Sequence, residues 1–457
     1  MTATRSLRTT VGEWVNRVAL ETPARLALGA FALVILIFTT LLKIPAATSS
    51  GQSASFLDAL FTATSAVCVT GLANVDIATF WSPIGLAIIA AAIKVGGLGI
   101  MTLASLVGLA VSRRLGLTQR LLAAGEARAS GLGDVKRLLG IVVVISTATE
   151  VLIAAILFPR FLTLGYGGWT SAGYSAFYAI SSFNNCGMSP DPVGLGPYAT
   201  DMWMLLPIAM GVLLGALGFP VYFNLLRSWR TPRKWTLHTK LTLTMLAVLS
   251  VVSASLLLLF EWDNPGTLGN ETTGATVGSV LFQSINQRSG GFSIIDISQA
   301  HQQTWLLEDV LMFIGGGSGG TAGGIRVTTL AVLLLAIWAE ARGRRDIEAF
   351  HKRIGTEVLR LAVSVALVSL FIVIVGTIVF MAVTGIALDR ALYEVVSAFA
   401  TCGLSTGITP ELNTAGDITL IVLMYVGRVG SLTVVAALAL NRQRTVIRYP
   451  AERPLVG

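Results

Sequence analysis

A glycine-ended tetrad occurs four times along this chain, at an almost constant interval of about 110 residues. Each copy follows a short amphipathic segment, so the chain consists of four repeats of domain-like length rather than of solenoid length. The copies share a register, because six positions before each glycine lie Ser65, Ser181, Ile285 and Ser397. The tetrads are Cys68-Val69-Thr70-Gly71, Asn184-Asn185-Cys186-Gly187, Arg288-Ser289-Gly290-Gly291 and Ala400-Thr401-Cys402-Gly403.

The composition is that of a membrane protein. Hydrophobic residues make up 54% of the 457 residues and charged residues only 12%, which is about half the charged share of an ordinary soluble domain. Apolar runs long enough to cross a bilayer lie at 24–44, 82–111, 137–158, 202–226, 237–260, 304–338 (interrupted), 357–384 and 416–440. Two runs for each tetrad predict eight transmembrane spans.

Lysine and arginine are concentrated in alternate connections between these runs. The basic segments are the N-terminal tail, the loops 112–137, 227–240 and 342–360, and the tail after Leu440. The positive-inside rule places these segments, and both termini, in the cytoplasm. The first run is too long for a signal peptide, so we expect it to remain as a membrane helix. The net charge of +8 follows from this topology, and a nucleic-acid partner is not needed to explain it.

Each tetrad falls in a connection on the outer side. The segments before the tetrads are too short to cross the membrane and suit re-entrant half-helices; they lie at 55–66, 171–183, 275–287 and 388–400. Irregular backbone at membrane depth is tolerated only where it is buried or lines a water-filled path. We therefore predict an all-α membrane protein with four pseudo-symmetric helix–pore loop–helix repeats around a central pore. The repeats are predicted at 24–111, 135–226, 236–341 and 354–440, between cytoplasmic tails at 1–23 and 441–457.

The tetrads suit a filter for a monovalent cation. Rings of backbone carbonyls can replace the hydration shell of potassium, and glycine permits the positive φ angles that turn carbonyls toward one axis. The C-terminal ends of the half-helices would add a partial negative charge. No tetrad contains Asp or Glu, so a carboxylate ring is not available. The candidate ion-binding residues are Cys68, Val69, Thr70, Gly71, Asn184, Asn185, Cys186, Gly187, Ser289, Gly290, Gly291, Thr401, Cys402 and Gly403.

With these features the chain resembles the Trk/Ktr/HKT superfamily of potassium transporters, and within it the Ktr membrane subunits. The resemblance covers residues 24–440 and rests on the four repeats and on the pieces Val69–Leu72, Phe183–Asn185, Arg288–Phe292, Cys402–Gly407 and Gly96–Thr102. It implies a homodimeric potassium pore in the bacterial plasma (inner) membrane. It also implies a separate cytoplasmic partner, a nucleotide-binding regulatory ring of the RCK (KtrA) type. Glycine at all four filter positions resembles the potassium-selective members, and Arg288 in the third tetrad follows the family pattern.

The sixth apolar run is interrupted by seven glycines between residues 315 and 324. At about 1 kcal/mol per glycine relative to alanine, no helix is expected to continue through this stretch. A dinucleotide-binding loop lacks its strand and βαβ context here, whereas a close-packing patch between helices stays open as an alternative. By resemblance, the stretch is a loop that gates the pore below the filter. Its gate residues would be Gly315, Gly316, Gly317, Ser318, Gly319, Gly320, Thr321, Gly323 and Gly324.

Two basic residues, Lys94 and Arg428, lie deep in otherwise apolar runs. An intramembrane charge is expensive, so each is a candidate functional residue. As members of the gate they would act as electrostatic brakes on cations, with the hydroxyls and carbonyls of the glycine-rich loop as partners. By resemblance, Arg428 matches a basic position in the last helix of the family. The alternative, which stays open, is that each residue pins two helices together or snorkels.

The three cysteines, Cys68, Cys186 and Cys402, all fall within tetrads. Their odd number, without a CxxC motif or a Cys/His cluster, predicts small packing residues rather than disulfides or a metal site. We find no catalytic constellation, so an enzyme is not expected. A channel-like potassium permease is the predicted function, with a sodium-coupled potassium symporter as the alternative and a membrane scaffold as a third class. Potassium, and sodium in the alternative, are the only ions expected, and no organic cofactor is.

Overall fold

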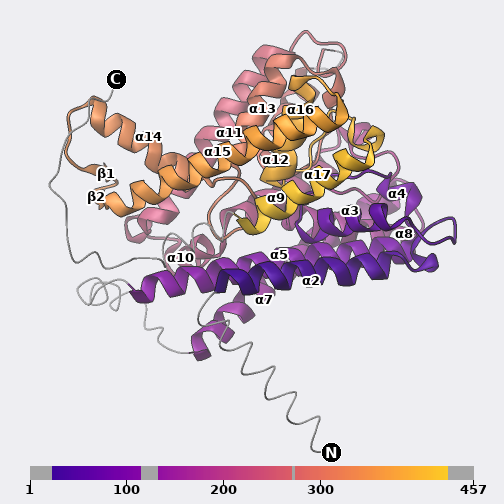
Figure 1. Ribbon diagram of the computed structural model, residues 1–457, viewed down its shortest axis with the longest axis horizontal. Helices are drawn as coiled ribbons and strands as arrows, with labels where there is room; N and C mark the ends of the chain where they lie inside the picture. Colours follow the sequence, from indigo (N-terminus) through magenta and orange to yellow (C-terminus); the bar gives the residue numbers. More distant parts are fainter. Residues whose placement is uncertain (1–22, 115–131, 270–272, 431–457) are drawn as a thin grey trace, which may run out of the picture.

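The computed structural model describes residues 23–114, 132–269 and 273–430, which are almost entirely helical (Figure 1). Several predictions fall outside these residues. They concern residues 1–22 of the N-terminal tail, most of the basic 112–137 loop, the last residues of the 416–440 run, and the tail 441–457.

The helices can be grouped by the four predicted repeats. In the first two repeats they are α2 Pro23–Leu42, α3 Phe56–Val67, α4 Ile77–Phe80, α5 Pro83–Arg114, α7 Leu132–Thr163, α8 Gly168–Phe183, α9 Met202–Leu217 and α10 Phe219–Ser228. In the last two they are α11 Leu237–Glu261, α12 Thr273–Asn286, α13 Gln302–Ile314, α14 Val327–Ala341, α15 Thr356–Thr384, α16 Leu388–Ala400 and α17 Thr414–Tyr425. A π-helical turn, Val426–Gly430, follows α17, and the hairpin β1 Ile347–Ala349 with β2 Lys352–Ile354 precedes α15.

Local sequence explains several helix starts. The Ser55 Oγ atom accepts a hydrogen bond from the Asp58 N–H at 3.0 Å and caps α3. Thr236 caps α11 in the same way, and the Asn413 side chain accepts from the Gly416 N–H to cap α17. Each of these side chains satisfies a backbone donor that the first turn leaves without an intrahelical partner.

The helices of each repeat pack on one another, and the repeats contact in a closed order. In the first repeat α2, α3 and α5 are in mutual contact, and in the fourth α15, α16 and α17 are. Between repeats, α5 contacts α8, α9 contacts α12, α13 contacts α16, and α17 contacts α3. The contact from the fourth repeat back to the first closes the ring, so four segments far apart in sequence share one centre.

The predicted span at 202–226 is not one continuous helix. The chain there forms two helices, α9 and α10, with an angle of 97° between them. The break lies at Gly218, whose φ of +82° ends α9, and Pro220 in the first turn of α10 cannot donate to a continuing helix. A Cβ atom at position 218 would overlap the carbonyl oxygen of Ser318. The bend therefore makes room for the glycine-rich segment of the third repeat.

Among the described residues, three helical stretches are long and apolar enough by themselves to cross a bilayer: Gly140–Thr163, Leu237–Glu261 and Thr356–Thr384. The bent pair α9 and α10 passes the same criterion together, and shorter apolar helices include Leu28–Leu42, Pro83–Gly99 and Val327–Ala341. The eight predicted spans stay a prediction.

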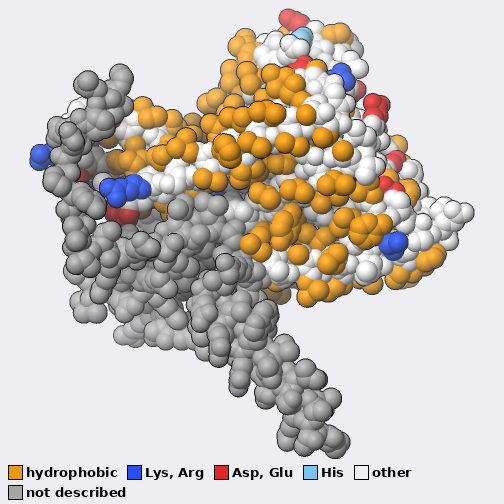
Figure 2. Space-filling view, viewed as in Figure 1, with side chains coloured by type: hydrophobic (Ala, Val, Ile, Leu, Met, Phe, Trp, Pro, Cys, Tyr) orange, Lys and Arg blue, Asp and Glu red, His pale blue; other side chains and the backbone are white. Residues whose placement is uncertain are grey.

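The outer faces of these helices are apolar. Along α15, the side chains of Leu367, Phe371, Ile374 and Ile378 recur at helical spacing and are all exposed. Figure 2 shows hydrophobic side chains spread over the face around α15, with charged side chains mainly at the edges of the view. An apolar surface of this extent is unfavourable in water and is typical of contact with lipid.

Two phenylalanines of α15 test this distinction between inside and outside. Phe380 is fully buried and Phe371 is 66% exposed. We expect Phe380→Ala to lower the free energy of unfolding by about 3–5 kcal/mol, because it leaves a cavity, and Phe371→Ala to change it little. The measurement is reversible unfolding of the purified chain in detergent. Equal losses for both variants would contradict the assignment of the lipid-facing side.

Candidate functional site

Four short helices lead into the four tetrads. α3 ends at Val67 and α8 at Phe183, each directly before its tetrad. α12 ends at Asn286, with one residue between it and its tetrad, and α16 ends at Ala400, the first tetrad residue. These bounds lie within a few residues of the predicted half-helices, so each helix presents its C-terminal end to the loop that follows it.

The loops of the first, second and fourth repeats meet backbone to backbone. A Cβ atom at Gly71 would overlap the carbonyl oxygen of Cys186, and a Cβ atom at Gly403 would overlap the carbonyl oxygen of Thr70. The Cα atom of Gly403 also lies close to the Cβ position of Gly71. These positions leave no room for a side chain.

The third loop completes the arrangement. A Cβ atom at Gly187 would lie against the backbone of Gly291, and one at Gly291 would overlap the carbonyl oxygen of Cys402. The four glycines therefore connect the loops in a closed ring: each loop contacts the next one along the chain, and the fourth contacts the first. All four have positive φ angles, as the sequence predicts: +101° at Gly71, +79° at Gly187, +73° at Gly291 and +95° at Gly403.

Three of the loops carry a second positive φ angle two residues before the glycine. It is +54° at Val69, +59° at Asn185 and +50° at Thr401. A β-branched residue rarely adopts this conformation, so the surrounding contacts must hold Val69 and Thr401 in it. The third loop has Ser289 at this position, without a positive φ, and so departs from the pattern of the other three.

The serine at the shared register explains part of this support. The Ser65 Oγ atom accepts a hydrogen bond from the Gly71 N–H at 3.0 Å, and the Ser397 Oγ atom accepts one from the Gly403 N–H at 3.1 Å. The Ser181 hydroxyl of the second repeat donates instead to the carbonyl oxygen of Met188 at 2.9 Å. The third repeat has an isoleucine at this register and follows neither pattern.

Three polar side chains of the tetrads bond to the supporting helices. The Asn184 Nδ2 atom donates to Glu150 of α7, and Asn185 Nδ2 donates to the carbonyl oxygen of Val212 in α9. Arg288 is buried and donates to the carbonyl oxygen of Leu246 at 3.0 Å and to a serine hydroxyl of α11 at 2.7 Å. The backbone oxygens that lie against a neighbouring loop, such as that of Cys186 at Gly71, are of a kind that can bind a monovalent cation.

The three cysteines are free and buried, as predicted for packing residues. The Cys402 thiol lies 3.6 Å from the carbonyl oxygen of Gln287 in the neighbouring loop. No group of three or more His, Cys, Asp or Glu side chains that could hold a metal ion occurs in the part of the chain that the structure describes.

The glycine-rich segment between α13 and α14 lies against the second and third loops. The Thr321 Oγ1 atom lies 2.8 Å from Asn185 Oδ1 and 3.1 Å from the carbonyl oxygen of Phe183. The Gly323 N–H donates to Ser289 Oγ at 3.0 Å. Backbone bonds to α9 hold its other side, where the Thr321 N–H donates to the carbonyl oxygen of Gly215. The helix is thus interrupted where the glycines predict, and the segment lies directly beside the loops.

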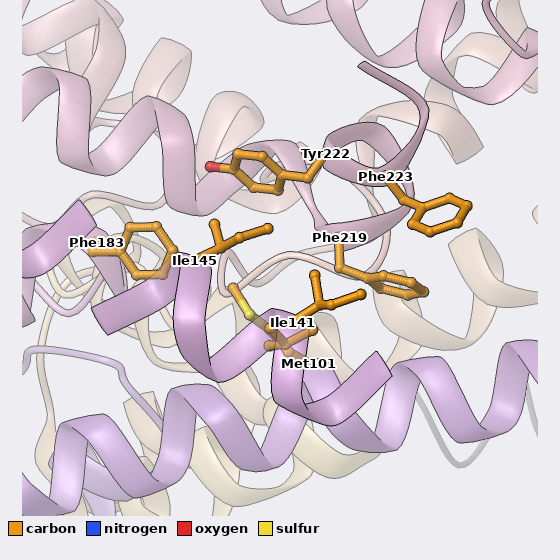
Figure 3. Close-up of a pocket in the computed structure, with 8 residues that line it drawn as sticks. Met101, Ile141, Ile145, Phe183, Phe219, Tyr222 and Phe223 are labelled. Carbon is orange, nitrogen blue, oxygen red and sulfur yellow. The ribbon is translucent and has the colours of Figure 1, made fainter. Parts of the chain in front are cut away.

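A small apolar cavity of about 20 Å³ lies beside this segment (Figure 3). Phe183 and Phe219 line it; the carbonyl oxygen of Phe183 accepts from the Thr321 hydroxyl, and the Phe219 N–H donates to the carbonyl oxygen of Gly319 in the glycine-rich segment. Met101, Ile145 and Tyr222 point into the same space from α5, α7 and α10. Its lining offers little to coordinate a cation, so we do not place an ion there.

Arg428 lies in the π-helical turn and is 3% exposed. Its described bond is to Thr401 Oγ1 at 3.2 Å, not to the glycine-rich loop as predicted. Thr401 itself touches that loop, because a Cβ atom at Gly323 would overlap Thr401 Oγ1. Among described residues, the Arg428 Nε and Nη2 atoms have no hydrogen-bond acceptor. The contact between Arg428 and the loop is therefore indirect.

The arginine that does bind the loop is Arg326, which sequence reasoning missed. Its guanidinium Nη1 lies 3.3 Å from the carbonyl oxygen of Gly317 and also donates to the carbonyl oxygen of Ala322. Its φ is +82°, unusual for a residue with a side chain. Its position directly after the glycine-rich stretch is the signal that could have identified it.

The predicted partners of Lys94 also differ from those observed. The Lys94 Nζ atom lies 2.6 Å from Glu150 Oε2 and 2.6 Å from Ser146 Oγ, both on α7. Sequence analysis did not single out Glu150, although an acidic residue in the apolar 137–158 run is a signal of the same kind as Lys94. These contacts are those of a charge pair that joins two helices.

A helical chain with apolar outer faces, in which four glycine-ended loops meet around one centre, has the architecture of a membrane cation transporter. The TrkH family model, described as "Cation transport protein", matches residues 13–446. The chain belongs to this family, which confirms the resemblance seen in the sequence.

Similar proteins agree with this assignment. The chain is 37% identical to the Ktr system potassium uptake protein B of Bacillus subtilis, over 95% of this chain and 96% of that protein. It is 33% identical to the potassium/sodium uptake protein NtpJ of Enterococcus hirae, over 95% and 97%. The crystal structure of the potassium transporter TrkH from Vibrio parahaemolyticus has the same fold, with a TM-score of 0.67 at 19% identity over 90% of this chain and 84% of that one. These relatives are transporters, which confirms that the chain is not an enzyme.

Proposed function

We propose that this chain takes up potassium across the bacterial plasma membrane through a filter of backbone carbonyls. The observation that carries the proposal is the closed set of four glycines, each placed against the backbone of a neighbouring loop. The names of relatives at 37% and 33% identity, both uptake proteins for potassium, support the same ion. In this proposal the ion enters from the side of the tetrads and leaves past the glycine-rich segment.

The chemistry of the centre favours a large monovalent cation. Carbonyl oxygens such as those of Thr70, Cys186 and Cys402 carry partial charge and suit an ion whose hydration shell is readily replaced. The C-terminal ends of α3, α8, α12 and α16 add about half a negative charge each if they point at the same centre. A divalent cation would require carboxylate ligands, and the tetrads contain none.

Sodium-coupled potassium symport is the second candidate, because one relative is named a potassium/sodium uptake protein. Tracer uptake in vesicles that contain only this chain separates the two functions. Saturable potassium uptake without sodium supports the permease. Potassium uptake that requires sodium supports the symporter, and the absence of potassium uptake in both conditions contradicts the proposal.

The first functional prediction concerns the crowding at Gly71. In Gly71→Ser the new side chain would displace the carbonyl oxygen of Cys186, so we expect sodium uptake to rise more than total uptake falls. Gly407→Ser is the matched control, because Gly407 has a similar φ of +88° but open space around its Cβ position. The measurement is the ratio of potassium to sodium uptake. An unchanged ratio in Gly71→Ser would count against a carbonyl filter.

We further propose that residues 315–324 form the gate, with Arg326 and Arg428 beside it. The segment is held by a few hydrogen bonds, one to Asn185 of the second loop, one to Ser289 of the third loop and two from its backbone N–H groups to α9. So few bonds give a small energy difference between two positions. A regulator that supplies a few kcal/mol could then shift the population of open pores substantially. The guanidinium of Arg428 would oppose cations at the base of the filter while the segment is in place.

The gate is tested by Thr321→Val, which keeps the shape of the side chain and removes its hydroxyl. The loss of the bonds to Asn185 and Phe183 should weaken the closed position and raise basal potassium uptake about two- to tenfold. Thr377→Val is the control, because the Thr377 hydroxyl is buried and bonds only within α15. Wild-type basal uptake in a folded Thr321→Val protein would place the gate elsewhere and favour the packing alternative.

We also propose that the chain works as a homodimer with a cytoplasmic RCK-type ring that binds nucleotide. The described part of the predicted cytoplasmic side carries exposed basic residues around the β1–β2 hairpin, including Arg344, Arg345 and Lys352. A ring that docks on this side through acidic groups would associate more weakly as salt rises, because exposed charges are screened.

Docking is tested by co-purification of the ring with the double variant Arg345→Glu/Lys352→Glu at about 0.05 M and 0.5 M salt. We expect the variant to lose most of the association at low salt, and the wild type to lose it only at high salt. Arg390→Glu, which changes an exposed charge in the first turn of α16, is the control. Equal association of all three proteins at both salt concentrations would exclude this docking surface.

A further inference from the structure

A charge pair between α5 and α7 links the first and second repeats. The Lys94 Nζ atom lies 2.6 Å from Glu150 Oε2, and the two side chains are 20% and 8% exposed. Ser146, one turn before Glu150 on α7, lies 2.6 Å from Lys94 Nζ and donates to Glu150 Oε1 at 3.1 Å. At membrane depth two such charges are stable only when each satisfies the other and the remaining hydrogen-bond sites are filled.

The same carboxylate reaches the second tetrad. The Asn184 Nδ2 atom donates to Glu150 Oε1 at 2.9 Å and lies 2.8 Å from the carbonyl oxygen of Ile180. Glu150 therefore uses one oxygen for Lys94 and the other for Ser146 and Asn184. A carboxylate held by three donors in this way has a defined position, and so has the amide that it binds.

Asn184 stands at the point where α8 becomes the loop. It is the C-cap residue of α8 and the first residue of the second tetrad, and the next residue, Asn185, takes the positive φ of +59°. On its other side a Cβ atom at Gly97 would overlap Asn184 Oδ1. The side-chain amide of Asn184 is thus held on two sides. Gly97 of the first repeat lies against its oxygen, and Glu150, paired with Lys94, accepts a hydrogen bond from its nitrogen.

We propose that Lys94 and Glu150 are positioning residues for ion selectivity, because through Asn184 they set the start of the second filter loop. The inference rests on the proposed filter and goes beyond it by naming what determines the position of one of its four loops. In this reading Lys94 is not a brake on cations, because its charge is balanced by Glu150. The carbonyl of Cys186, two residues after Asn184, lies against Gly71 of the first repeat. A change in the pair therefore alters the distance between two ligand-bearing loops.

The variants separate charge from hydrogen bonding. Glu150→Gln removes the charge and keeps an oxygen that can accept from Asn184, whereas Glu150→Leu removes both. Lys94→Met keeps the apolar part of the side chain and removes its charge. The double variant Lys94→Met/Glu150→Gln carries neither charge, so it can be tested if a single variant fails to fold because one buried charge is left unbalanced. The controls are Arg160→Met and Asp201→Asn. They break another ion pair, between Arg160 of α7 and Asp201, the N-cap of α9, with 2.6 Å between Arg160 Nε and Asp201 Oδ2; within the described part of the chain this pair makes no bond to a tetrad.

Two ratios are measured for each purified protein: the KM for sodium over that for potassium in vesicle uptake, and the same ratio of Kd values from thermal protection by each ion. We expect Glu150→Leu to lower both ratios about tenfold, because this is the size of effect expected when a hydrogen bond to a charged group is lost. Glu150→Gln, Lys94→Met and their double variant should give smaller losses of the same sign. The controls should stay within about twofold of the wild type, as for a partly exposed pair.

Wild-type ratios in folded Glu150→Leu, or in the double variant if the single variants do not fold, would overturn the inference and leave the pair as a link between helices. Equal losses in the controls would overturn it as well, because any ion pair on α7 would then have the same effect. A wild-type chain that neither takes up nor binds potassium would instead overturn the proposed function on which the inference rests.

Discussion

The close approach of four backbone segments at one centre is the constraint on which the rest of the structure depends. Where a glycine of one loop lies against the carbonyl oxygen of the next, as at Gly71 and Cys186, no side chain can fit. The loops therefore cannot be held from the inside. Their support has to come from the helices behind them, and the side chains of Asn184, Asn185 and Arg288 accordingly bond to those helices.

Much of that support consists of hydrogen bonds made by side chains that are buried in apolar surroundings. Serine hydroxyls accept from Gly71 and Gly403, Glu150 accepts from Asn184, and Arg288 donates to α11. A polar group without a partner costs more at such a place than in water. Breaking these hydrogen bonds would therefore be costly. This cost explains how residues such as Val69 and Thr401 are kept at positive φ angles, which they would otherwise avoid.

The positions of the helices before the tetrads could be predicted closely, because each ends where small polar residues and a glycine follow. The interruption after Ile314 could also be predicted, since seven glycines remove helix propensity over a whole segment. The bend at Gly218 could not. A single glycine within an apolar run is tolerated in many helices, and only the insertion of the segment around Ser318 turns it into a break. Arg428, for its part, lies near the predicted segment but bonds to Thr401.

By itself the sequence predicted four repeats and determined the positions of the four glycines and the apolar character of the helices, because each of these follows from local residue type and spacing. The tertiary structure decided the partners. Lys94 and Glu150 are 56 positions apart along the chain, and Asn185 meets Thr321 across 136. Residue type states that a buried charge or amide needs a partner, but which one it finds depends on how the repeats close around their common centre.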